Sequence, residues 1–183
     1  MLNLLRRNYR RFYKYVICRR DPIKYAKKIG VNFTGNVKTY GKVIWGSEPW
    51  LITVGDNVHI TDGVKFINHE GSVLIYQKDI PDLEVSKPIN IGNNVFIGNN
   101  VIILPGVNIG NNVIIGAGAI VTRSIPDNSV VGGCPAKIIK RSEELLEKLK
   151  NSSTHLGNLP PEKKDIALRK YHGYQGETKG IYF

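Results

Sequence analysis

The side chain best suited to acid–base chemistry in this sequence is His69. It occupies a turn-type position of a six-residue repeat, and the repeat stops two residues later for the excursion loop 71–88. Loops inserted into a regular chain usually mark its binding face. A neutral imidazole can remove a proton from a hydroxyl near pH 7, so His69 is predicted to act as a general base.

Two acidic residues could orient that imidazole. Glu70 is adjacent to His69, and Glu48 lies in the irregular segment GSEPW, which would come one coil below His69 if it carries a bulge. Each carboxylate could instead be an ordinary surface charge. Ser47 and Asn68 are further candidates for contacts with an acceptor molecule. The remaining histidines are predicted to lie on the coil surface or in the tail: His59, His155 and His172.

A strict six-residue repeat must position these side chains. From Val54 the chain reads VGDNVH, ITDGVK and FINHEG, and after the loop it continues as IGNNVF, IGNNVI, ILPGVN, IGNNVI, IGAGAI and VTRSIP. Each unit opens with an aliphatic or aromatic residue, and glycine usually follows. Upstream, Val31, Val37 and Val43 keep the spacing, but the step from Val43 to Val54 is 11 residues.

A fixed short period indicates a solenoid. Three units make a triangular coil, and successive coils stack as parallel strands about 4.8 Å apart. First-position residues would point inward, while Gly, Asn and Asp would occupy the corners, where a left-handed backbone is needed. The predicted fold is therefore an all-β solenoid, a left-handed parallel β-helix. Hairpins of a sandwich are the alternative, but they do not keep six-residue phase over consecutive units.

The run IGNNVFIGNNVIILPGVNIGNNVIIGAGAIVTRSIPDNSVVGGCPAKIIK, with a histidine before a loop, resembles the hexapeptide-repeat acyltransferases. The resemblance covers residues 31–141. Within this superfamily, the run most resembles the O-acetyltransferases of sugars and surface polysaccharides, such as the galactoside and maltose enzymes. It implies a homotrimer that uses acetyl-CoA and no metal. It also implies that the acceptor hydroxyl, deprotonated by His69, attacks the thioester directly, and that Glu48 lies near the acceptor hydroxyls.

The same resemblance implies a set of donor-binding residues. In the sugar acetyltransferases, coenzyme A lies in the groove between two subunits. The matching positions here are Phe96, Asn99, Ala117, Thr122, Arg123, Lys137 and Lys140. The first three would meet the acetyl arm and pantetheine, the next two the nucleotide end, and the two lysines the phosphates. Basic residues at the end of a solenoid are also often simply solvated.

Both ends of the chain are predicted to be helical extensions. In the N-terminal arm 1–30, residues 1–28 hold ten Lys or Arg and one acid, so +9 of the net charge of +11 lies there. This amphipathic arm could cap the open end of the solenoid or touch an anionic membrane surface, and the two roles are compatible. Residues 142–183 are predicted to form a helix capped by Ser142, a second helix around 162–171 and a tail.

The composition indicates where in the cell the protein is expected and which classes of partner it does not suit. No apolar run reaches the roughly 18 residues that span a membrane, and the arginine-rich N-terminus does not suit a signal peptide. Cys18 and Cys134 lie far apart, which suits a reducing cytoplasm, so a cytoplasmic location is expected, with the inner face of the membrane as an option. Outside the arm, 16 basic and 14 acidic residues are too balanced for nucleic-acid binding.

The leading functional hypothesis is O-acetyl transfer to a sugar hydroxyl in surface polysaccharide biosynthesis. An N-acetyltransferase acting on an amino-sugar nucleotide would share the fold and the base. A non-catalytic β-helix scaffold would be flat, and the loop 71–88 argues against it. A zinc lyase needs three converging imidazoles, whereas the coils contain only His59 and His69. The sequence does not specify the acceptor.

Overall fold

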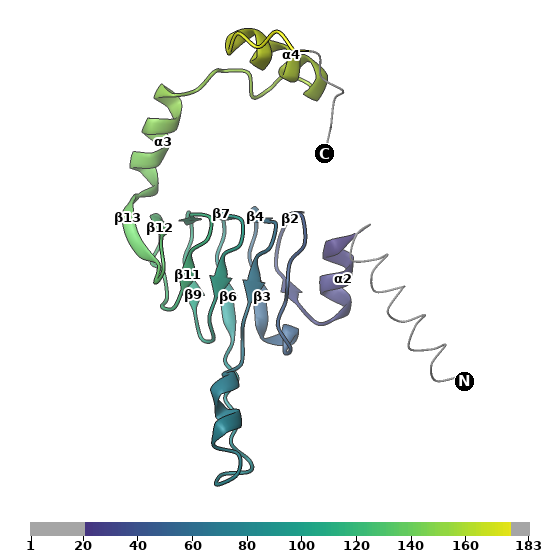
Figure 1. Cartoon of the computed structure of the whole chain (residues 1–183), viewed down its shortest axis with the longest axis vertical. Helices are drawn as coiled ribbons and strands as arrows, with labels where there is room; N and C mark the ends of the chain where they lie inside the picture. The colour runs from purple at the N-terminus through teal and green to yellow at the C-terminus, as the bar shows by residue number, and fades with distance from the viewer. Residues whose placement is uncertain (1–20, 177–183) are drawn as a thin grey trace, which may run out of the picture. The chain divides into compact units, whose positions relative to one another are not determined.

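The structure, a computed structural model, describes residues 21–176 and contains parallel β-sheets with helices at the ends of the chain (Figure 1). Sheet A has the strand order β1-β3-β6-β9, sheet B the order β2-β4-β7-β10-β12-β13 and sheet C the order β5-β8-β11. Neighbouring strands are parallel except for β12 and β13, which pair antiparallel.

The strands are short, as a six-residue repeat requires. Those of sheet A are β1 Asn32–Phe33, β3 Ile52–Val54, β6 Ile89–Ile91 and β9 Asn108–Ile109. Those of sheet B are β2 Val37–Tyr40, β4 Val58–Thr61, β7 Val95–Ile97, β10 Ile114–Ile115, β12 Ser129–Gly132 and β13 Lys137–Arg141. Those of sheet C are β5 Lys65–Phe66, β8 Ile102–Ile103 and β11 Ile120–Val121.

From β6 to β11, successive strands belong to sheets A, B and C in turn. Paired residues in these neighbouring coils are three hexapeptides apart in sequence. β6, β7 and β8 belong to sheets A, B and C, and β9, β10 and β11 follow in the same order. Asn90 pairs with Asn108, and Phe96 pairs with Ile114, each partner being 18 residues away. The predicted parallel sheets are confirmed, whereas the left-handed β-helix as a whole stays a prediction.

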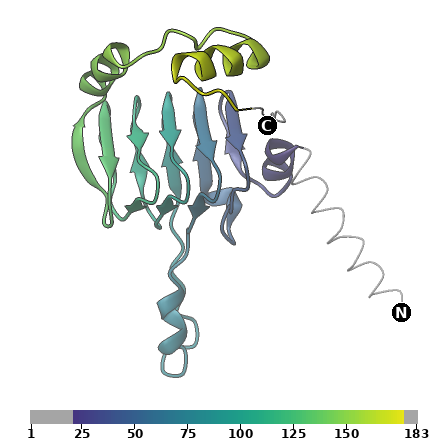
Figure 2. The same ribbon diagram turned by 45° about the horizontal axis from the view of Figure 1, so that its top comes forward.

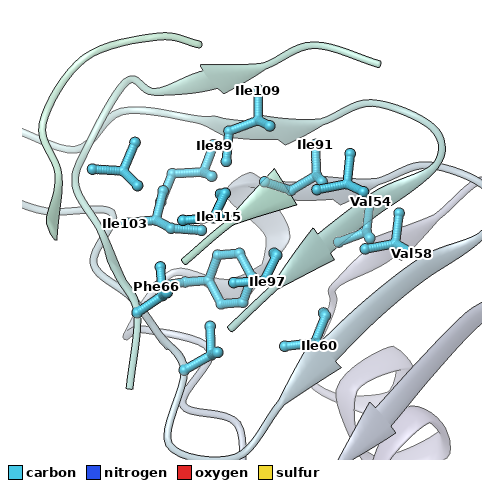
Figure 3. Close-up of a cluster of buried hydrophobic side chains, with 14 of the residues drawn as sticks. Val54, Val58, Ile60, Phe66, Ile89, Ile91, Ile97, Ile103, Ile109 and Ile115 are labelled. Carbon is cyan, nitrogen blue, oxygen red and sulfur yellow. The ribbon is translucent and has the colours of Figure 1, made fainter. Parts of the chain in front are cut away.

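The apolar residue that opens each repeat points into the space between the sheets (Figure 3). None of these residues is more than 4% exposed: Val54, Ile60, Phe66, Ile91, Ile97, Ile103, Ile109, Ile115 and Val121. Burying one such side chain contributes about 1.5–3 kcal/mol. In the irregular 11-residue step, the Trp45 ring stacks on Phe66 with a centroid distance of 5.0 Å. The bulged coil therefore packs a larger side chain into the same core.

Asparagines with a left-handed backbone stack along the corner between sheets A and B. The φ angles are 52° at Asn57, 55° at Asn94 and Asn112, and 58° at Asn128. Each Nδ2 donates to Oδ1 of the next asparagine, over 3.0, 3.1 and 2.9 Å in chain order. Asparagine suits this corner because it tolerates positive φ and its amide can both donate and accept.

The outer faces of the three sheets differ in chemistry. Side chains alternate between the two faces of a strand, so the residues between the buried ones point outward. Sheet A presents a polar row: Asn32, Thr53, Asn90 and Asn108. Sheet B presents a mixed row with aromatic rings: Lys38, His59, Phe96 and Ile114. Sheet C presents a largely apolar row: Ile44, Lys65, Ile102 and Ile120.

A short helix closes the first coil. Helix α2, Pro22–Lys28, begins after Asp21, whose Oδ1 accepts from Lys24 N at 2.9 Å. Ala26 is fully buried and belongs to the core cluster of the coils. This segment of the predicted N-terminal cap is therefore helical and packs on the body, while residues 1–20 of the predicted arm lie outside the described residues.

The chain divides into two compact units, Met1–Glu143 and Glu144–Phe183. Helix α3, Ser142–Asn151, starts at the residue expected to cap it, and α4 spans Pro161–Tyr171. Neither helix has a buried residue. Within residues 21–176, no helix is both long enough and apolar enough to cross a membrane.

Replacing Asn94 tests the asparagine ladder. Asn94→Ala removes two hydrogen bonds and places alanine at φ 55°, so it should lower the free energy of unfolding by about 2–3 kcal/mol. Asn94→Gly removes the same bonds but tolerates the backbone, so its loss should be about 1–2 kcal/mol. Urea unfolding followed by circular dichroism measures both. Equal stability of Asn94→Ala and the unmodified protein would contradict the ladder's role.

Candidate active site

His69 lies at the corner between sheets C and A, where the excursion loop leaves and rejoins the body. It follows the end of β5 and forms an antiparallel bridge with Ser86 on the returning side of the loop. Glu70 N donates to Val85 O at 2.8 Å. These contacts close the base of the loop, so the stem of the loop holds the backbone of His69 in place.

Ser47 and Glu48 come from the coil below and contact the imidazole. The bridge between Ile44 and Lys65 sets a register of 21 residues, which aligns Glu48 with His69. His69 Nδ1 lies 2.7 Å from Ser47 Oγ and 3.3 Å from Glu48 Oε2. Ser47 Oγ donates to Glu48 Oε2 at 2.9 Å. The side chain of His69 is 43% exposed, so the ring has one side held by the protein and one side open.

The hydrogen bonds determine which ring nitrogen of His69 can accept a proton. The Glu48 carboxylate can only accept, so the Ser47 hydroxyl must donate to it. Because a hydroxyl has a single proton, Ser47 then accepts from Nδ1–H of His69. The neutral ring carries its lone pair on Nε2, which forms no hydrogen bond within residues 21–176. A general base needs this tautomer.

A buried amide supports the backbone of Glu48. Asn68 is 0% exposed, and its Nδ2 donates to Glu48 O. The same carbonyl accepts from Leu51 N at 2.9 Å, which closes the 3₁₀ turn Pro49–Leu51. At Gly46, where φ is 72°, a Cβ would come 2.5 Å from Asn68 Oδ1. Asn68, expected to contact an acceptor, is thus enclosed and holds the segment that carries Glu48.

Glu70 directs its carboxylate into the loop. Its Oε1 accepts from Ser72 N at 3.0 Å and caps the 3₁₀ helix η2, Gly71–Ile75. This backbone hydrogen bond lowers the pKa of Glu70, with a smaller contribution from the charge of His69. Glu70 is therefore close enough for the charge of His69 to affect its pKa. The hydrogen bond to the ring, however, comes from Ser47, which is bonded in turn to Glu48.

The predicted donor-binding residues lie on other parts of the body. Asn99 and Ala117 occupy successive coils at the corner between sheets B and C, where Gly118 N donates to Asn99 O at 2.7 Å. The exposed side chain of Phe96 lies nearby on the outer face of sheet B. The remaining predicted residues follow β11 or lie on β13: Thr122, Arg123, Lys137 and Lys140.

A single chain does not bring the predicted base and the pantetheine contacts together. Asn99 precedes β8, at the end of sheet C where its strands begin. His69 follows β5, at the end where the strands of the same sheet finish. The two residues therefore lie beyond opposite ends of the strands of sheet C within one chain.

His59 belongs to a separate pair on sheet B, as expected of a surface histidine. Its Nδ1 is 2.8 Å from Tyr40 Oη, and its Nε2 is 3.2 Å from Asn57 Oδ1. Both ring nitrogens are thus engaged, unlike those of His69. In the described part of the chain, no group of three or more His, Cys, Asp or Glu side chains could hold a metal ion.

Sequence reasoning missed the position of Ser47 between His69 and Glu48. It gave Glu48 and the adjacent Glu70 equal weight as the acid that orients the ring, and it treated Ser47 as a contact of the acceptor. The signal that could have found the row is the irregular step after Val43, because it holds three residues more than a regular coil and places them at the corner below His69.

Nitrogen NMR of histidine-labelled protein can test the tautomer of His69. At a pH where the ring is neutral, Nε2 should show the chemical shift of an unprotonated nitrogen. Ser47→Ala/Glu48→Ala should lose this preference, because no group then accepts from Nδ1–H. Ser72→Ala removes only the hydroxyl beside Glu70, keeps the backbone cap, and should leave the preference intact. A protonated Nε2 in the unmodified protein would count against the assignment.

Known proteins share this repeat and most of this chain. Residues 88–123 match the family described as bacterial transferase hexapeptide (six repeats). Protein CapG of Staphylococcus aureus is 46% identical over 144 residues, which cover 78% of this chain and 84% of CapG. Further curated relatives match over smaller shares of their own length, from 32% to 58%.

Two solved structures are similar over most of their length. A maltose O-acetyltransferase from Clostridium difficile 630 has a TM-score of 0.57 and 26% identity, covering 77% of this chain and 88% of that one. A galactoside acetyltransferase in complex with coenzyme A has a TM-score of 0.56 and 32% identity, covering 68% of this chain and 71% of that one. With the CapG match, they show that this chain belongs to the hexapeptide-repeat acetyltransferases.

Proposed function

We propose that this chain is an acetyl-CoA-dependent O-acetyltransferase with a left-handed β-helical body, acting on a sugar hydroxyl in surface polysaccharide biosynthesis. The observation that carries the proposal is the row Glu48–Ser47–His69, which leaves the Nε2 lone pair facing outward at the base of a loop. The similar structures support the substrate classes, since one is a maltose O-acetyltransferase and the other a galactoside acetyltransferase with coenzyme A.

Transfer takes place directly from donor to acceptor. His69 Nε2 removes the proton of the acceptor hydroxyl while the hydroxyl oxygen attacks the thioester carbonyl carbon. When the tetrahedral adduct collapses, the C–S bond breaks and the thiolate of coenzyme A takes the proton from the imidazolium. Glu48, 3.3 Å from Nδ1, stabilises the positive charge that the ring carries between these two proton transfers. Ser47 keeps the ring oriented throughout.

A second copy of the chain completes the site. In a ring of three chains with sheet C facing the axis, the His69 corner of one chain meets the Asn99–Ala117 corner of the next. The outer face of sheet C suits such contact because Ile102 and Ile120 are apolar, whereas the matching row of sheet A is mostly asparagine. Burying these side chains in a closed ring is favourable and leaves no open edge. The proposed assembly is a homotrimer with three shared sites.

The donor binds along the coils beyond the base. Asn99 and Ala117 present backbone and amide groups to the pantetheine amides, and Phe96 offers an apolar surface beside the thioester. Lys137 and Lys140 on β13 supply positive charge for the phosphates of coenzyme A, where they act as point charges. The donor and the acceptor would then meet at the boundary between two chains.

Removing the base tests the proposed chemistry. Purified His69→Asn should lose acetyl transfer by about 100- to 10,000-fold while remaining folded, because asparagine suits turn positions of the repeat. His155→Asn makes the same replacement at a histidine far along the chain in the tail and should leave transfer unchanged. Transfer is measured with labelled acetyl-CoA and a panel of cell-envelope saccharides. Full activity of a folded His69→Asn protein would exclude His69 as the base.

Two lysines and a mixing experiment test the donor side. Lys137→Ala/Lys140→Ala should raise KM for acetyl-CoA more than it lowers kcat, since phosphate contacts stabilise ground and transition states alike.

Subunit exchange between this variant and His69→Asn tests whether the sites are shared. The mixture is assayed at acetyl-CoA concentrations below the raised KM. It should regain activity, because some boundaries between subunits then hold neither defect. Verified exchange without recovery would argue against shared sites.

A further inference from the structure

An exposed tryptophan lies in the segment that carries the Glu48 carboxylate. Trp50 is 64% exposed, whereas Trp45 is 4% exposed and belongs to the core. The ring of Trp50 forms no aromatic contact and no hydrogen bond with any of residues 21–176. Tryptophan combines a large apolar surface with one N–H donor, which makes it frequent in binding surfaces. Both features of this indole are open to a ligand.

The 3₁₀ turn Pro49–Leu51 holds the backbone of Trp50 in place. Its first residue is buried, and its last residue donates N–H to Glu48 O at 2.9 Å. The enclosed Asn68 amide donates to the same carbonyl. At Gly30, where φ is 109°, a Cβ would come 3.3 Å from Trp50 Cβ, so the first coil lies close against the base of the side chain. A group held in this way loses little conformational entropy when it binds a ligand.

Trp50 and His69 lie at the same corner of the body. In Figures 1 and 2, the segment between β2 and β3 reaches the edge from which the excursion loop projects. Glu48 Oε2 is 3.3 Å from His69 Nδ1, and the Cα atoms of Glu48 and Trp50 are at most about 7 Å apart along the chain. The free Nε2 is on the opposite side of the imidazole. Trp50 would therefore meet a part of the acceptor away from the hydroxyl that reacts.

The outer face of sheet A continues from Trp50 as an uncharged polar surface. Thr53 points outward from β3 and lies between Asn32 and Asn90 in register. Among the described residues, neither the Asn32 amide nor the Thr53 hydroxyl has a hydrogen-bond partner on its side chain. Hydroxyl and amide groups can donate to and accept from sugar hydroxyls. The phosphates of a nucleotide sugar would instead favour Arg or Lys, which this row lacks.

We infer that Trp50, with the adjoining row Asn32, Thr53 and Asn90, binds a sugar residue next to the one that is acetylated. The indole stacks on the apolar C–H face of that sugar, and the row of sheet A bonds its hydroxyls. The inference rests on the proposed function and specifies its acceptor as an uncharged stretch of an oligosaccharide or polysaccharide. Because the proposed ring uses sheet C, sheet A remains open to this acceptor.

Tryptophan fluorescence tests the binding without acetyl transfer. The chain has two tryptophans, and only Trp50 is exposed. Acrylamide should quench Trp50 in the free protein, and tetrasaccharides of the cell-envelope panel should protect it in the absence of acetyl-CoA. In the control Trp50→Phe, only the buried Trp45 remains, so neither addition should change the emission. A Trp50 that is already shielded in the free protein, by the N-terminal arm or by a second copy, would contradict the inference.

The length of the acceptor tests the same surface during transfer. We expect kcat/KM to be about tenfold higher for an acetylated tetrasaccharide than for its monosaccharide unit, and Trp50→Ala should abolish this gain. Trp50→Phe should keep most of it, because a smaller ring still stacks. Tyr171→Ala removes a ring on α4 that is 65% exposed and should keep the whole gain. With the monosaccharide, all four proteins should be equally active.

The outcomes separate this inference from the proposed function. Equal kcat/KM for the two acceptors, or a length gain that survives in Trp50→Ala, overturns the sugar subsite and leaves acetyl transfer in place. An equal loss with both acceptors means that Trp50 acts through Glu48, which also overturns it. Trp50-dependent transfer to an amino-sugar nucleotide would assign the indole to a nucleobase. No transfer to any saccharide overturns the proposed function, whereas protection of Trp50 by a tetrasaccharide would still support the binding surface.

Discussion

Parallel backbone pairing between successive coils is the constraint on which the rest of this structure depends. A strand inside the stack bonds to strands of the coils before and after it, so a coil cannot change length within such a strand without breaking two ladders. Extra residues can enter only at corners. The excursion loop obeys this rule, because Phe66 and Ile103 remain direct partners although the loop lies between them in sequence. The most irregular feature of the chain therefore leaves the core unchanged.

The same stacking brings together a reactive row from residues far apart in sequence. Ser47 and Glu48 reach the ring of His69 because the coil below has a 21-residue register, three residues longer than the 18 of the regular coils, and turns at Gly46 with positive φ. The distortion has local support: Asn68 holds the carbonyl of Glu48, and Trp45 fills the core beneath it. Each side chain in the row has a defined donor or acceptor role, and the ring has one nitrogen left for chemistry.

Three faces of one body have three different chemistries, and this difference organises the proposed assembly. The polar asparagine row of sheet A suits water, the isoleucine row of sheet C suits a subunit contact, and sheet B carries exposed rings. Because the proposed base lies where the strands of sheet C finish and the predicted donor contacts lie where they begin, the same contact that buries the apolar face would also complete the site. Stability and activity would then depend on one interface.

The sequence by itself determined the repeat, the inward residues and the corner asparagines, because periodicity and turn chemistry are local properties that single residues report. It also singled out His69, since the interruption of a regular period is visible without coordinates. It could not decide between Glu70 and Glu48, because adjacency in the chain does not show where a carboxylate points. That choice was made by the tertiary structure: the Ile44–Lys65 register aligns Glu48 beneath the ring, while the backbone of Ser72 draws Glu70 into the loop.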